Sequence, residues 1–521
     1  MKSLFTKSLM SIALSAALFS NSAYAEGIDR STLSRKPIDN LVYASSSEPV
    51  GFDPHLTNDN ESANILVNIY ESLLKFKPDS ADVEPALAKS WTISDDGLTY
   101  TLKLQEGVKF HDGTDFNAQA VKYNIDRQMP GKRLPGMGYA DLVYSDVKSS
   151  RVIDDHTIEI TLKAPSTPFI RNLAMAFAAP VISPAALEKH GNNVMEHPSG
   201  TGPYQLVAWD KGQQVVVTTF KDYWGPKPPV QNVIYKVIKD TSARVVALNN
   251  GEVDIITGID ANVVDRIEKG GSKVFTVEGN NTNYISFNSR PGFVTADREV
   301  RRAIAQAINV PELVKTLYRQ YSTPAHSFFP PIVPGYSPDT RTVTYNPDEA
   351  RKTLAAKGVK ELTLLTYSDV RTYNPAGGQV LAEAIQDYLS KVGVKVNIHA
   401  YDWTSYKNRV VTDSWDLSLI GWTGDNGDPD NFINILASKD PLMNQGMWQN
   451  PEFIDIIQKA VRLPDGPERI ALYQKADGIV AEDVGAFPIS HAMTMAAHRP
   501  NVEGHIIHPK AVFRFFEVRK K

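Results

Sequence analysis

Cysteine is absent from the 521 residues of the chain, and neither sign of charge dominates. A disulfide scaffold, a cysteine nucleophile and lipid attachment through an N-terminal cysteine are therefore excluded. The 55 Lys and Arg residues against 59 Asp and Glu residues give a net charge of −4. This balance lacks the domain-wide basic excess that binding to a phosphate backbone requires. With 42% hydrophobic residues the chain is neither disordered nor collagen-like.

The sequence motifs of common enzyme and metal sites are also missing. There is no phosphate-binding Gly-x-x-x-x-Gly-Lys-Ser/Thr loop, no Gly-x-Ser-x-Gly nucleophile elbow and no His-Glu-x-x-His zinc motif. His505 and His508 form the closest histidine pair, without a third ligand at suitable spacing. Asp428 and Asp430 lack the twelve-residue spacing of a calcium loop. We expect no catalytic residue, no cofactor and no metal.

The first residues have the pattern of an export signal. Lys2 and Lys7 precede an apolar stretch of 11 residues from Leu9 to Phe19, and Ala23-Tyr24-Ala25 forms a small-x-small cleavage site. No later segment approaches the roughly 20 apolar residues of a membrane-spanning helix. The sequence predicts that residues 1–25 are removed near Ala25 and that the mature protein is exported and soluble.

At this length we expect about three folded units. Alternating apolar residues predict strands over 98–104 and 158–162, with a helix between them that is capped by Asp115 or Asn117 and runs to Arg127. Residues 61–198 are therefore typical of an α+β unit. Further strands are expected at 215–220, 233–238, 253–256 and 284–287. The pattern becomes helical from about Val300.

The clearest α/β signal lies in the last third of the chain. A strand at 362–365 precedes a helix with one apolar stripe, Gly393 ends that helix, and the next strand covers 394–398. A strand, helix and strand at this spacing predict a parallel pair with a right-handed crossover. A further strand is expected at 417–422. Ligands in open α/β sheets bind beyond the carboxyl ends of the strands, so the loops after residues 366 and 422 are candidate binding loops.

These two loops carry opposite charges. Arg371 lies in the first loop and Asp425 in the second. An arginine fork fits a carboxylate, and an aspartate accepts hydrogen bonds from an ammonium group. The pair suits a zwitterion, and an extended dipeptide spans roughly 7 Å at about 3.3–3.6 Å per residue. The residues alone leave open that Arg371 is a solvated surface charge and Asp425 a turn residue.

Several motifs resemble those of the peptide-binding receptors of bacterial ABC importers, the peptide and nickel type known as solute-binding family 5. They include Leu87-Ala88-Lys89-Ser90-Trp91, Glu106 to Gly113, Ser199 to Tyr204 and Leu248 to Asp254. The run from Gly421 to Phe432 resembles the signature of the dipeptide-binding branch. So does Arg371-Thr372-Tyr373-Asn374-Pro375 in the other loop, although Thr372 stands where that signature has proline. The resemblance covers essentially the whole mature chain.

The resemblance implies a function and a set of site residues. Asp425 takes the amino group of a peptide, Arg371 takes its carboxylate, and the backbone of Gly421, Trp422 and Thr423 pairs with its main chain. The aromatic residues Tyr373, Trp403 and Trp422 are candidates for the walls of side-chain pockets, although buried aromatic residues are usually ordinary core packing. The implied protein is a monomeric, non-enzymatic periplasmic receptor that delivers dipeptides or short oligopeptides to an inner-membrane ABC permease.

The resemblance also implies an α/β architecture of two lobes with a third, inserted α+β domain. We expect domain I at 31–60, 199–285 and 497–521, domain II at 61–198 and domain III at 286–496, with hinges near Ile285 to Asn288 and near residue 496. Asp112 to Ala118 and Ile182 to Lys189 are at least as similar to the glutathione-binding branch. A glutathione receptor is therefore the alternative, followed by a nickel or haem receptor.

Overall fold

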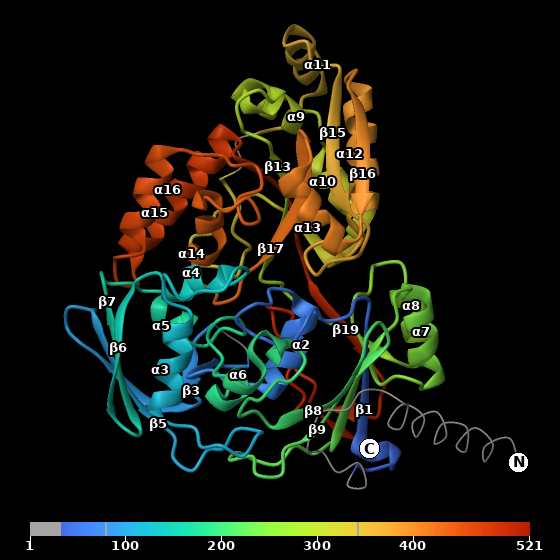
Figure 1. Ribbon diagram of the computed structural model, residues 1–521. Coiled ribbons are helices and arrows are strands. Elements are labelled where there is room, and N and C mark those ends of the chain that lie inside the picture. Colours follow the sequence, from blue (N-terminus) through green and yellow to red (C-terminus); the bar gives the residue numbers. More distant parts are fainter. Residues whose placement is uncertain (1–32, 79–80, 341–342) are drawn as a thin grey trace, which may run out of the picture.

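The computed structural model describes residues 33–78, 81–340 and 343–521, so the expected signal peptide lies outside the described residues. The described residues form a lower lobe with two large sheets and two small two-stranded ones, and an upper lobe with one sheet (Figure 1). This mixed α/β, two-lobed architecture confirms the expected fold class. Within the described ranges, no helix has both the length and the apolar character needed to cross a membrane.

The main sheet of the lower lobe has seven strands, drawn from three separate stretches of the chain. Its order is β12 (Lys273–Val277), β19 (Thr494–His498), β11 (Ile255–Ile256), β1 (Asn40–Ser45), β10 (Asn232–Val237), β9 (Gln214–Thr219) and β8 (Tyr204–Asp210). The central strand β1 is buried along its whole length and pairs in parallel with β10 and β11. The other pairings are antiparallel.

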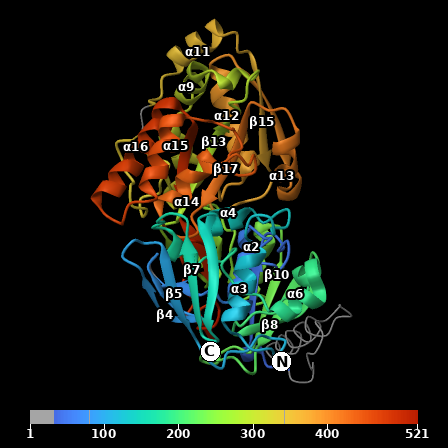
Figure 2. The same ribbon diagram turned by 60° about the vertical axis from the view of Figure 1, so that its left-hand side comes forward.

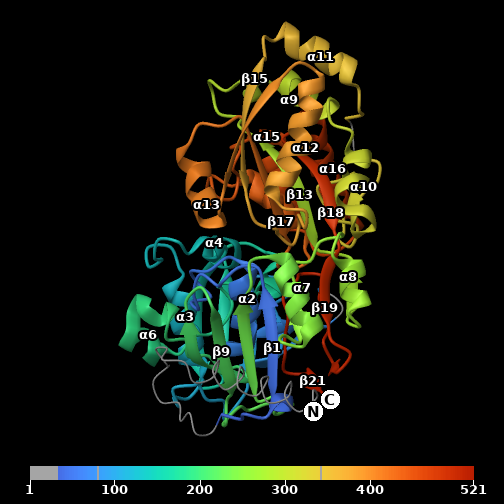
Figure 3. The ribbon, with the colours of Figure 1, turned by 90° about the vertical axis from the view of Figure 1, so that its right-hand side faces the viewer.

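Both faces of this sheet are covered by helices, because successive side chains of a strand point to opposite faces. Leu41 and Tyr43 of β1 belong to a core shared with helix α2 (Asn60–Ile69). Val42 and Ala44 belong to a separate core formed with α7 (Thr241–Asn250) and α8 (Val264–Lys269). Helix α2 is thereby fixed between the main sheet and the upper lobe (Figure 3).

The second sheet of the lower lobe is a four-stranded antiparallel sheet. Its order is β4 (Ala88–Ile93), β5 (Thr99–Leu104), β7 (Thr157–Leu162) and β6 (Val147–Asp154), and α3 (Ala118–Arg127) lies beside it (Figure 2). Of the two candidate caps it is Asn117 that starts α3, where its side chain accepts a hydrogen bond from the Ala120 N–H at 2.9 Å. This sheet and the inner face of the main sheet share one hydrophobic core.

Short elements complete the lower lobe. They are η2 (Pro37–Asp39), the hairpin of β2 (Leu74–Phe76) and β3 (Val83–Pro85), α4 (Gly138–Tyr144), α5 (Phe169–Asn172), α6 (Pro184–His190), η3 (Gly191–Met195), and the pair β20 (Val502–Glu503) and β21 (Arg519–Lys520).

The upper lobe contains a mixed six-stranded sheet. Its order is β14 (Ser322–Pro324), β18 (Ala486–Ala492), β13 (Asn281–Phe287), β17 (Leu417–Thr423), β15 (Glu361–Tyr367) and β16 (Lys395–Tyr401). Its helices are η4 (Val294–Ala296), α9 (Arg298–Gln306), α10 (Val310–Tyr318), η5 (Arg319–Tyr321), α11 (Pro347–Ala356), α12 (Gly378–Lys391), α13 (Trp403–Thr412), α14 (Pro429–Ile433), η6 (Asn434–Ala437), α15 (Pro451–Ala460) and α16 (Pro467–Asp483).

The predicted strand, helix and strand of this lobe are confirmed. Strands β15 and β16 pair in parallel over seven residues and are connected by α12. Gly393 follows the helix with a φ of 88°, in the left-handed region that favours glycine. Strand β15 also pairs in parallel with the start of β17. The loops after β15 and β17 therefore leave the sheet at the same edge, next to the lower lobe.

The two crossings between the lobes lie earlier in the chain than the expected hinges. Strand β12 of the lower sheet ends at Val277, and β13 of the upper sheet begins at Asn281, so the first crossing is at 278–280. Ile285 lies in the middle of β13, paired with β17 and β18 on its two sides. The return crossing is Met493, between β18 and β19 (Figure 3). An apolar strand buried between two neighbours gives no local sign that it is next to a hinge.

Candidate functional site

Arg371 lies in the loop that follows β15, in a turn closed by its own backbone. Its N–H donates to the Asn374 carbonyl at 3.1 Å, and the Asn374 N–H donates to the Arg371 carbonyl at 2.9 Å. The buried Asn374 side chain fixes this turn, since it accepts from the Tyr318 hydroxyl at 2.8 Å and donates to the Tyr367 hydroxyl at 3.1 Å. The loop is thus rigidly attached to the core of the upper lobe.

The Arg371 guanidinium lies over the ring of Trp403, with its central carbon 4.0 Å from the ring centroid. The Trp403 ring in turn stacks on Tyr406, at 5.5 Å between centroids. This contact orients the planar fork and lets its N–H groups face the space between the lobes. In the described part of the chain, no ion pair joins Arg371 to a carboxylate. Its charge is available to a ligand.

Asp425 lies in the loop that follows β17 and is held from behind by Asn431. The Asp425 N–H and the Trp422 indole N–H both donate to the Asn431 side-chain oxygen, at 2.8 and 3.1 Å. Further along the loop, the Asp428 carboxylate accepts from Arg469 at 2.7 Å, a pair with only 1% and 3% of its side chains exposed. These bonds fix the loop on the upper lobe.

The carboxylate of Asp425 faces the lower lobe, and its Oδ2 accepts a hydrogen bond from the Tyr139 hydroxyl at 3.0 Å. Burial raises the pKa of the Asp425 carboxyl to about 7, against the lowering effects of the Tyr139 hydrogen bond and the Lys510 charge. No cation of the described residues lies within ion-pair distance of this carboxylate. A ligand ammonium would supply that missing partner.

Each of the two charged loops lines a cavity on its lower-lobe side, and the two cavities share one lining residue. Asp425 and Thr423 line a cavity of about 130 Å³, and Arg371 and Thr372 line a smaller one of about 60 Å³. Asn60 of α2 lines both, and its side-chain N–H donates to the Thr372 hydroxyl at 3.4 Å. The hydroxyls of Thr372 and Thr423 are 3.2 Å apart. Two adjoining cavities with an arginine at one end and an aspartate at the other suit a small molecule with two charged ends.

One edge of β17 is open where it reaches these cavities. Strand β15 pairs only with Leu417 and Ser418, and on that side the described residues provide no strand partner for Gly421 to Thr423. The Gly424 N–H donates to the Asn280 carbonyl at 2.7 Å. Hydrogen-bonded and non-hydrogen-bonded positions alternate along an antiparallel pair, so Gly424 and Trp422 are positions that bond to β13. The backbone groups of Gly421 and Thr423, at the positions between and beside them, therefore point away from β13.

The predicted aromatic residues support the loops more than they line pockets. The Tyr373 ring packs against Gly421, where an added Cβ would lie 2.2 Å from the tyrosine Cδ2, so only glycine fits. Tyr373 is buried among the upper-lobe core residues. The Trp422 ring stacks on Tyr139 across the lobe boundary, at 6.4 Å between centroids.

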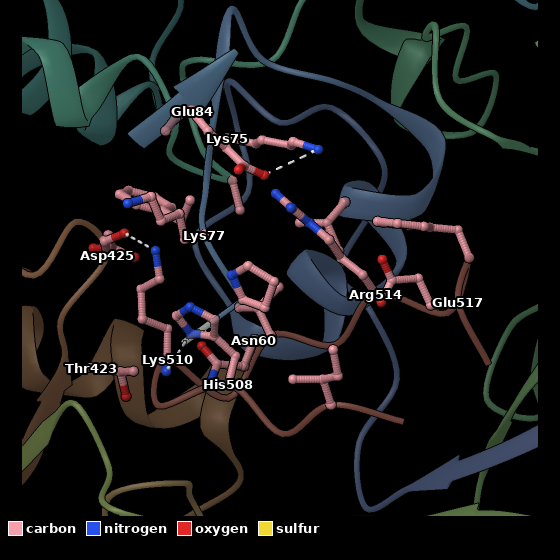
Figure 4. A pocket seen from close by; sticks show the side chains of 18 of the residues that line it. Asn60, Lys75, Lys77, Glu84, Thr423, Asp425, His508, Lys510, Arg514 and Glu517 are labelled. Atoms are coloured by element: carbon pink, nitrogen blue, oxygen red, sulfur yellow. Dashed lines mark hydrogen bonds and ion pairs between the residues drawn. The ribbon is translucent and has the colours of Figure 1, made fainter. Parts of the chain in front are cut away.

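Sequence reasoning missed the lower-lobe side of the site. Side chains of alternate residues in the C-terminal segment line the cavity beside Asp425, among them Lys510 and Arg514 (Figure 4). The Lys510 Nζ donates to the Asp425 backbone carbonyl at 3.1 Å. The usable signal was the alternation of these charged residues with the buried Phe513 and Phe515. Of the two histidines near the end of the sequence, His505 packs on Phe513 and Phe515, whereas His508 lines the cavity beside Asp425.

The two lobes are in direct contact around this site. Arg462 of the upper lobe makes a two-pronged ion pair with Asp146 of the lower lobe, at 2.6 and 3.1 Å. Arg171 reaches Asp465 at 2.9 Å. The side-chain amide of Asn426 donates to that of Asn172 at 2.6 Å. Among the described residues, no group of three His, Asp or Glu side chains is arranged to hold a metal ion.

Comparison with known proteins identifies relatives along nearly the whole chain. Residues 82–444 match the model of the middle region of bacterial extracellular solute-binding proteins, family 5. The chain is 31% identical over 509 residues to the dipeptide-binding protein of Escherichia coli K12, covering 92% of this chain and 94% of that protein. It is 32% identical over 489 residues to the glutathione-binding protein GsiB of Escherichia coli O6:K15:H31, covering 91% and 93%.

A solved structure has the same fold. The periplasmic binding protein DppA of Helicobacter pylori, an ABC-transporter-associated protein in complex with the peptide STSA, superimposes with a TM-score of 0.85 at 31% identity. The match covers 92% of this chain and 98% of that one.

Proposed function

The chain belongs to the bacterial extracellular solute-binding proteins of family 5, and we propose that it captures dipeptides or short oligopeptides between its lobes. It then delivers them to an ABC permease in the inner membrane. The proposal rests on the family and on relatives that are named as dipeptide-binding or were solved with a peptide. It assigns a binding role and no catalytic step.

One observation carries the choice of ligand. Arg371 and Asp425 are oppositely charged, have no ion-pair partner among the described residues, and line adjoining cavities that share Asn60. Both side chains are partly removed from water, so each gains from a ligand that supplies the opposite charge. A peptide with free ends has one carboxylate and one ammonium group. Arg371 would bind the first and Asp425 the second.

The open edge of β17 supports recognition of a peptide main chain. An extended peptide placed beside Gly421 to Thr423 would add one strand to the upper sheet and bond to backbone groups that have no strand partner there. Bonds to the main chain do not depend on side-chain identity. Such a receptor accepts many sequences and fixes the two ends.

The cellular setting follows from the expected export signal and from the periplasmic relatives. We propose that the signal is cleaved near Ala25, that the mature receptor is a periplasmic monomer, and that it needs no cofactor. Mass spectrometry of the secreted protein would give the mature N-terminus, and light scattering would give the oligomeric state.

Glutathione is the second candidate ligand, since a glutathione-binding relative matches this chain as closely as the dipeptide-binding one. Glutathione also has a free ammonium group at one end and a carboxylate at the other. The clamp of Arg371 and Asp425 therefore accommodates both ligand classes, and a competition measurement must rank them.

Calorimetry with end-blocked peptides tests the proposal. Ala-Ala should bind, whereas N-acetyl-Ala-Ala and Ala-Ala amide should each bind at least about tenfold more weakly, because each leaves one charged side chain unpaired. Glutathione added as competitor ranks the second candidate. If blocked and free peptides bind equally well, or if no peptide and no glutathione binds, the proposed function is wrong.

A further inference from the structure

Lys510 is partly buried and lies in an unusual environment. Its Nζ lies 2.9 Å from the centroid of the Phe76 ring and donates to the backbone carbonyl of Asp425. No carboxylate of the described residues lies within ion-pair distance of it. Burial, together with the charge of Arg514, lowers the pKa of Lys510 well below its usual value. The site therefore holds a lysine whose charge has no anionic partner.

Arg514 lines the same cavity and is the second cation there. It makes no hydrogen bond or ion pair within the described ranges, although Glu71, Glu84 and Glu517 are close enough to act on its charge. Two of these acids are already engaged. Glu84 pairs with Lys75 at 3.2 Å, and Glu71 accepts hydrogen bonds from three neighbouring side chains, while Glu517 is exposed at the rim. Figure 4 shows Lys510 extended toward Asp425 and Arg514 across the cavity from it.

The fold holds both cations toward the cavity. The Phe513 N–H donates to the Asn64 side chain and the Phe515 N–H to the Asn68 side chain, both at 2.9 Å. Asn64 and Asn68 are one turn apart on α2, so they hold Phe513 and Phe515, which are two residues apart in the extended segment. Phe513 and Phe515 then point into the core, and the intervening side chains point the other way.

Arg371 and Asp425 match the two ends of a peptide. Of the lysine and arginine side chains that line the cavity beside Asp425, Lys75 and Lys77 pair with acids, whereas Lys510 and Arg514 make no ion pair within the described ranges. We infer that this cavity receives a second carboxylate, carried by the ligand residue whose ammonium group binds Asp425. The inference deepens the proposed function and rests on it. The preferred ligands are peptides that begin with an acidic residue.

Two kinds of first residue have this chemistry. An α-linked aspartyl or glutamyl residue carries the second carboxylate on its side chain, and a γ-linked glutamyl residue carries it on its α-carbon, next to the ammonium group. The cavity wall also includes Val67, Phe76, Ala174 and Phe177, which suit the methylene groups of such a residue. Both sources share one feature: a carboxylate within a few bonds of the ammonium group.

Matched neutral ligands test the inference by calorimetry. Glu-Ala should bind at least about tenfold more tightly than Gln-Ala, which has the same shape without the charge. γ-Glu-Ala compared with its α-carboxamide tests the other linkage in the same way. A preference in either pair supports the inference and identifies the source of the carboxylate.

Protein variants assign that preference to the two cations. In Lys510→Met the ratio between Glu-Ala and Gln-Ala should fall to within about twofold of unity, and Arg514→Met should reduce it in part. Lys77→Met is the matched control, because Lys77 lines the same cavity but is half exposed and pairs with Asp82 at 3.2 Å. A lysine that only supports the Asp425 loop would lower the affinity for both ligands and leave the ratio unchanged.

Two results would overturn the inference while the proposed function stands: equal binding of the acidic and neutral ligands, or an acid preference that survives in Lys510→Met. Failure of all four ligands to bind would instead contradict the proposed function itself.

Discussion

The Tyr139 hydroxyl of the lower lobe donates a hydrogen bond to Asp425 of the upper lobe at 3.0 Å. The carboxylate that we assign to the ligand ammonium group is therefore completed by the opposite lobe. When the lobes separate, Asp425 loses this donor and gains water. We therefore expect ligand affinity and lobe closure to be linked through this carboxylate, as in the hinge closure of periplasmic binding proteins.

Replacement of Asp425 by asparagine should weaken the binding of Ala-Ala by about 2–5 kcal/mol, because the ligand ammonium group is left buried without its charged partner. Isothermal calorimetry measures the change. Glu517→Gln removes a carboxylate from the exposed rim of the same cavity and should retain nearly full affinity. Unchanged binding in Asp425→Asn would contradict the assignment.

The pH dependence of binding should report the ionisation of Asp425. With the lobes in contact its pKa is about 7, so below pH 7 the carboxyl must lose a proton before it can bind an ammonium group between them. Affinity for Ala-Ala should therefore rise from pH 5.5 to about 7, by up to about tenfold per pH unit. It should fall again above pH 8, where the peptide amino group itself loses its proton.

Two variants separate Asp425 from other groups that titrate near the same pH. Burial raises the pKa of Glu61 and of Asp430 to about 7 as well. Asp425→Asn should flatten the slope below pH 7, and Tyr139→Phe should shift the midpoint to higher pH, since it removes a hydrogen bond that favours the ionised form. A slope that persists in Asp425→Asn would assign the titration to another residue.

Arg371→Lys should weaken the binding of Ala-Ala by about 10- to 100-fold, equal to about 1.4–2.8 kcal/mol. Lysine keeps the charge but loses both the two-pronged contact with a carboxylate and the planar stack on Trp403. A second ligand serves as the control. Ala-Ala amide lacks the carboxylate and binds more weakly, so its affinity should be nearly the same for the parent protein and for Arg371→Lys. A similar loss for both ligands would mean that the substitution disturbs the loop as a whole.

Arg469→Met should destabilise the protein by about 3–5 kcal/mol, because it leaves the buried Asp428 without its main partner. Urea unfolding followed by tryptophan fluorescence would measure the free energy. Lys475→Met on the same helix removes an exposed pair with Glu452 and should change stability by less than about 1 kcal/mol. Equal effects of the two substitutions would show that the buried pair has no special role in stability.

The sequence predicts those parts of the fold in which the chemical pattern is local. Strand β15, helix α12 and strand β16 each have a clear period, and Gly393 marks the boundary between the last two. Parallel pairing then places the loops of Arg371 and Asp425 at one edge of the sheet. Both loops could therefore be selected before their surroundings were known.

The parts that escaped prediction depend on distant contacts. Lys510 lies on an extended segment without helix or strand, held by Asn64 and Asn68 from the other end of the chain. Tyr139 approaches Asp425 only because the lobes meet. The crossing before Asn281 is hidden because β13 is a fully buried strand next to it. The segment of Lys510 does leave one periodic signal, the alternation of its charged and buried residues, but that signal does not identify Asn64, Asn68 or Asp425 as its partners.

The extended segment from Lys510 to Phe515 belongs to the lower lobe, yet it supplies one wall of the cavity beside Asp425 of the upper lobe. Two side-chain amides of α2, those of Asn64 and Asn68, accept hydrogen bonds from its backbone. The shape of this wall is therefore set by a helix that is more than 440 residues away in the sequence. A change in α2 would alter the cavity without touching the upper lobe.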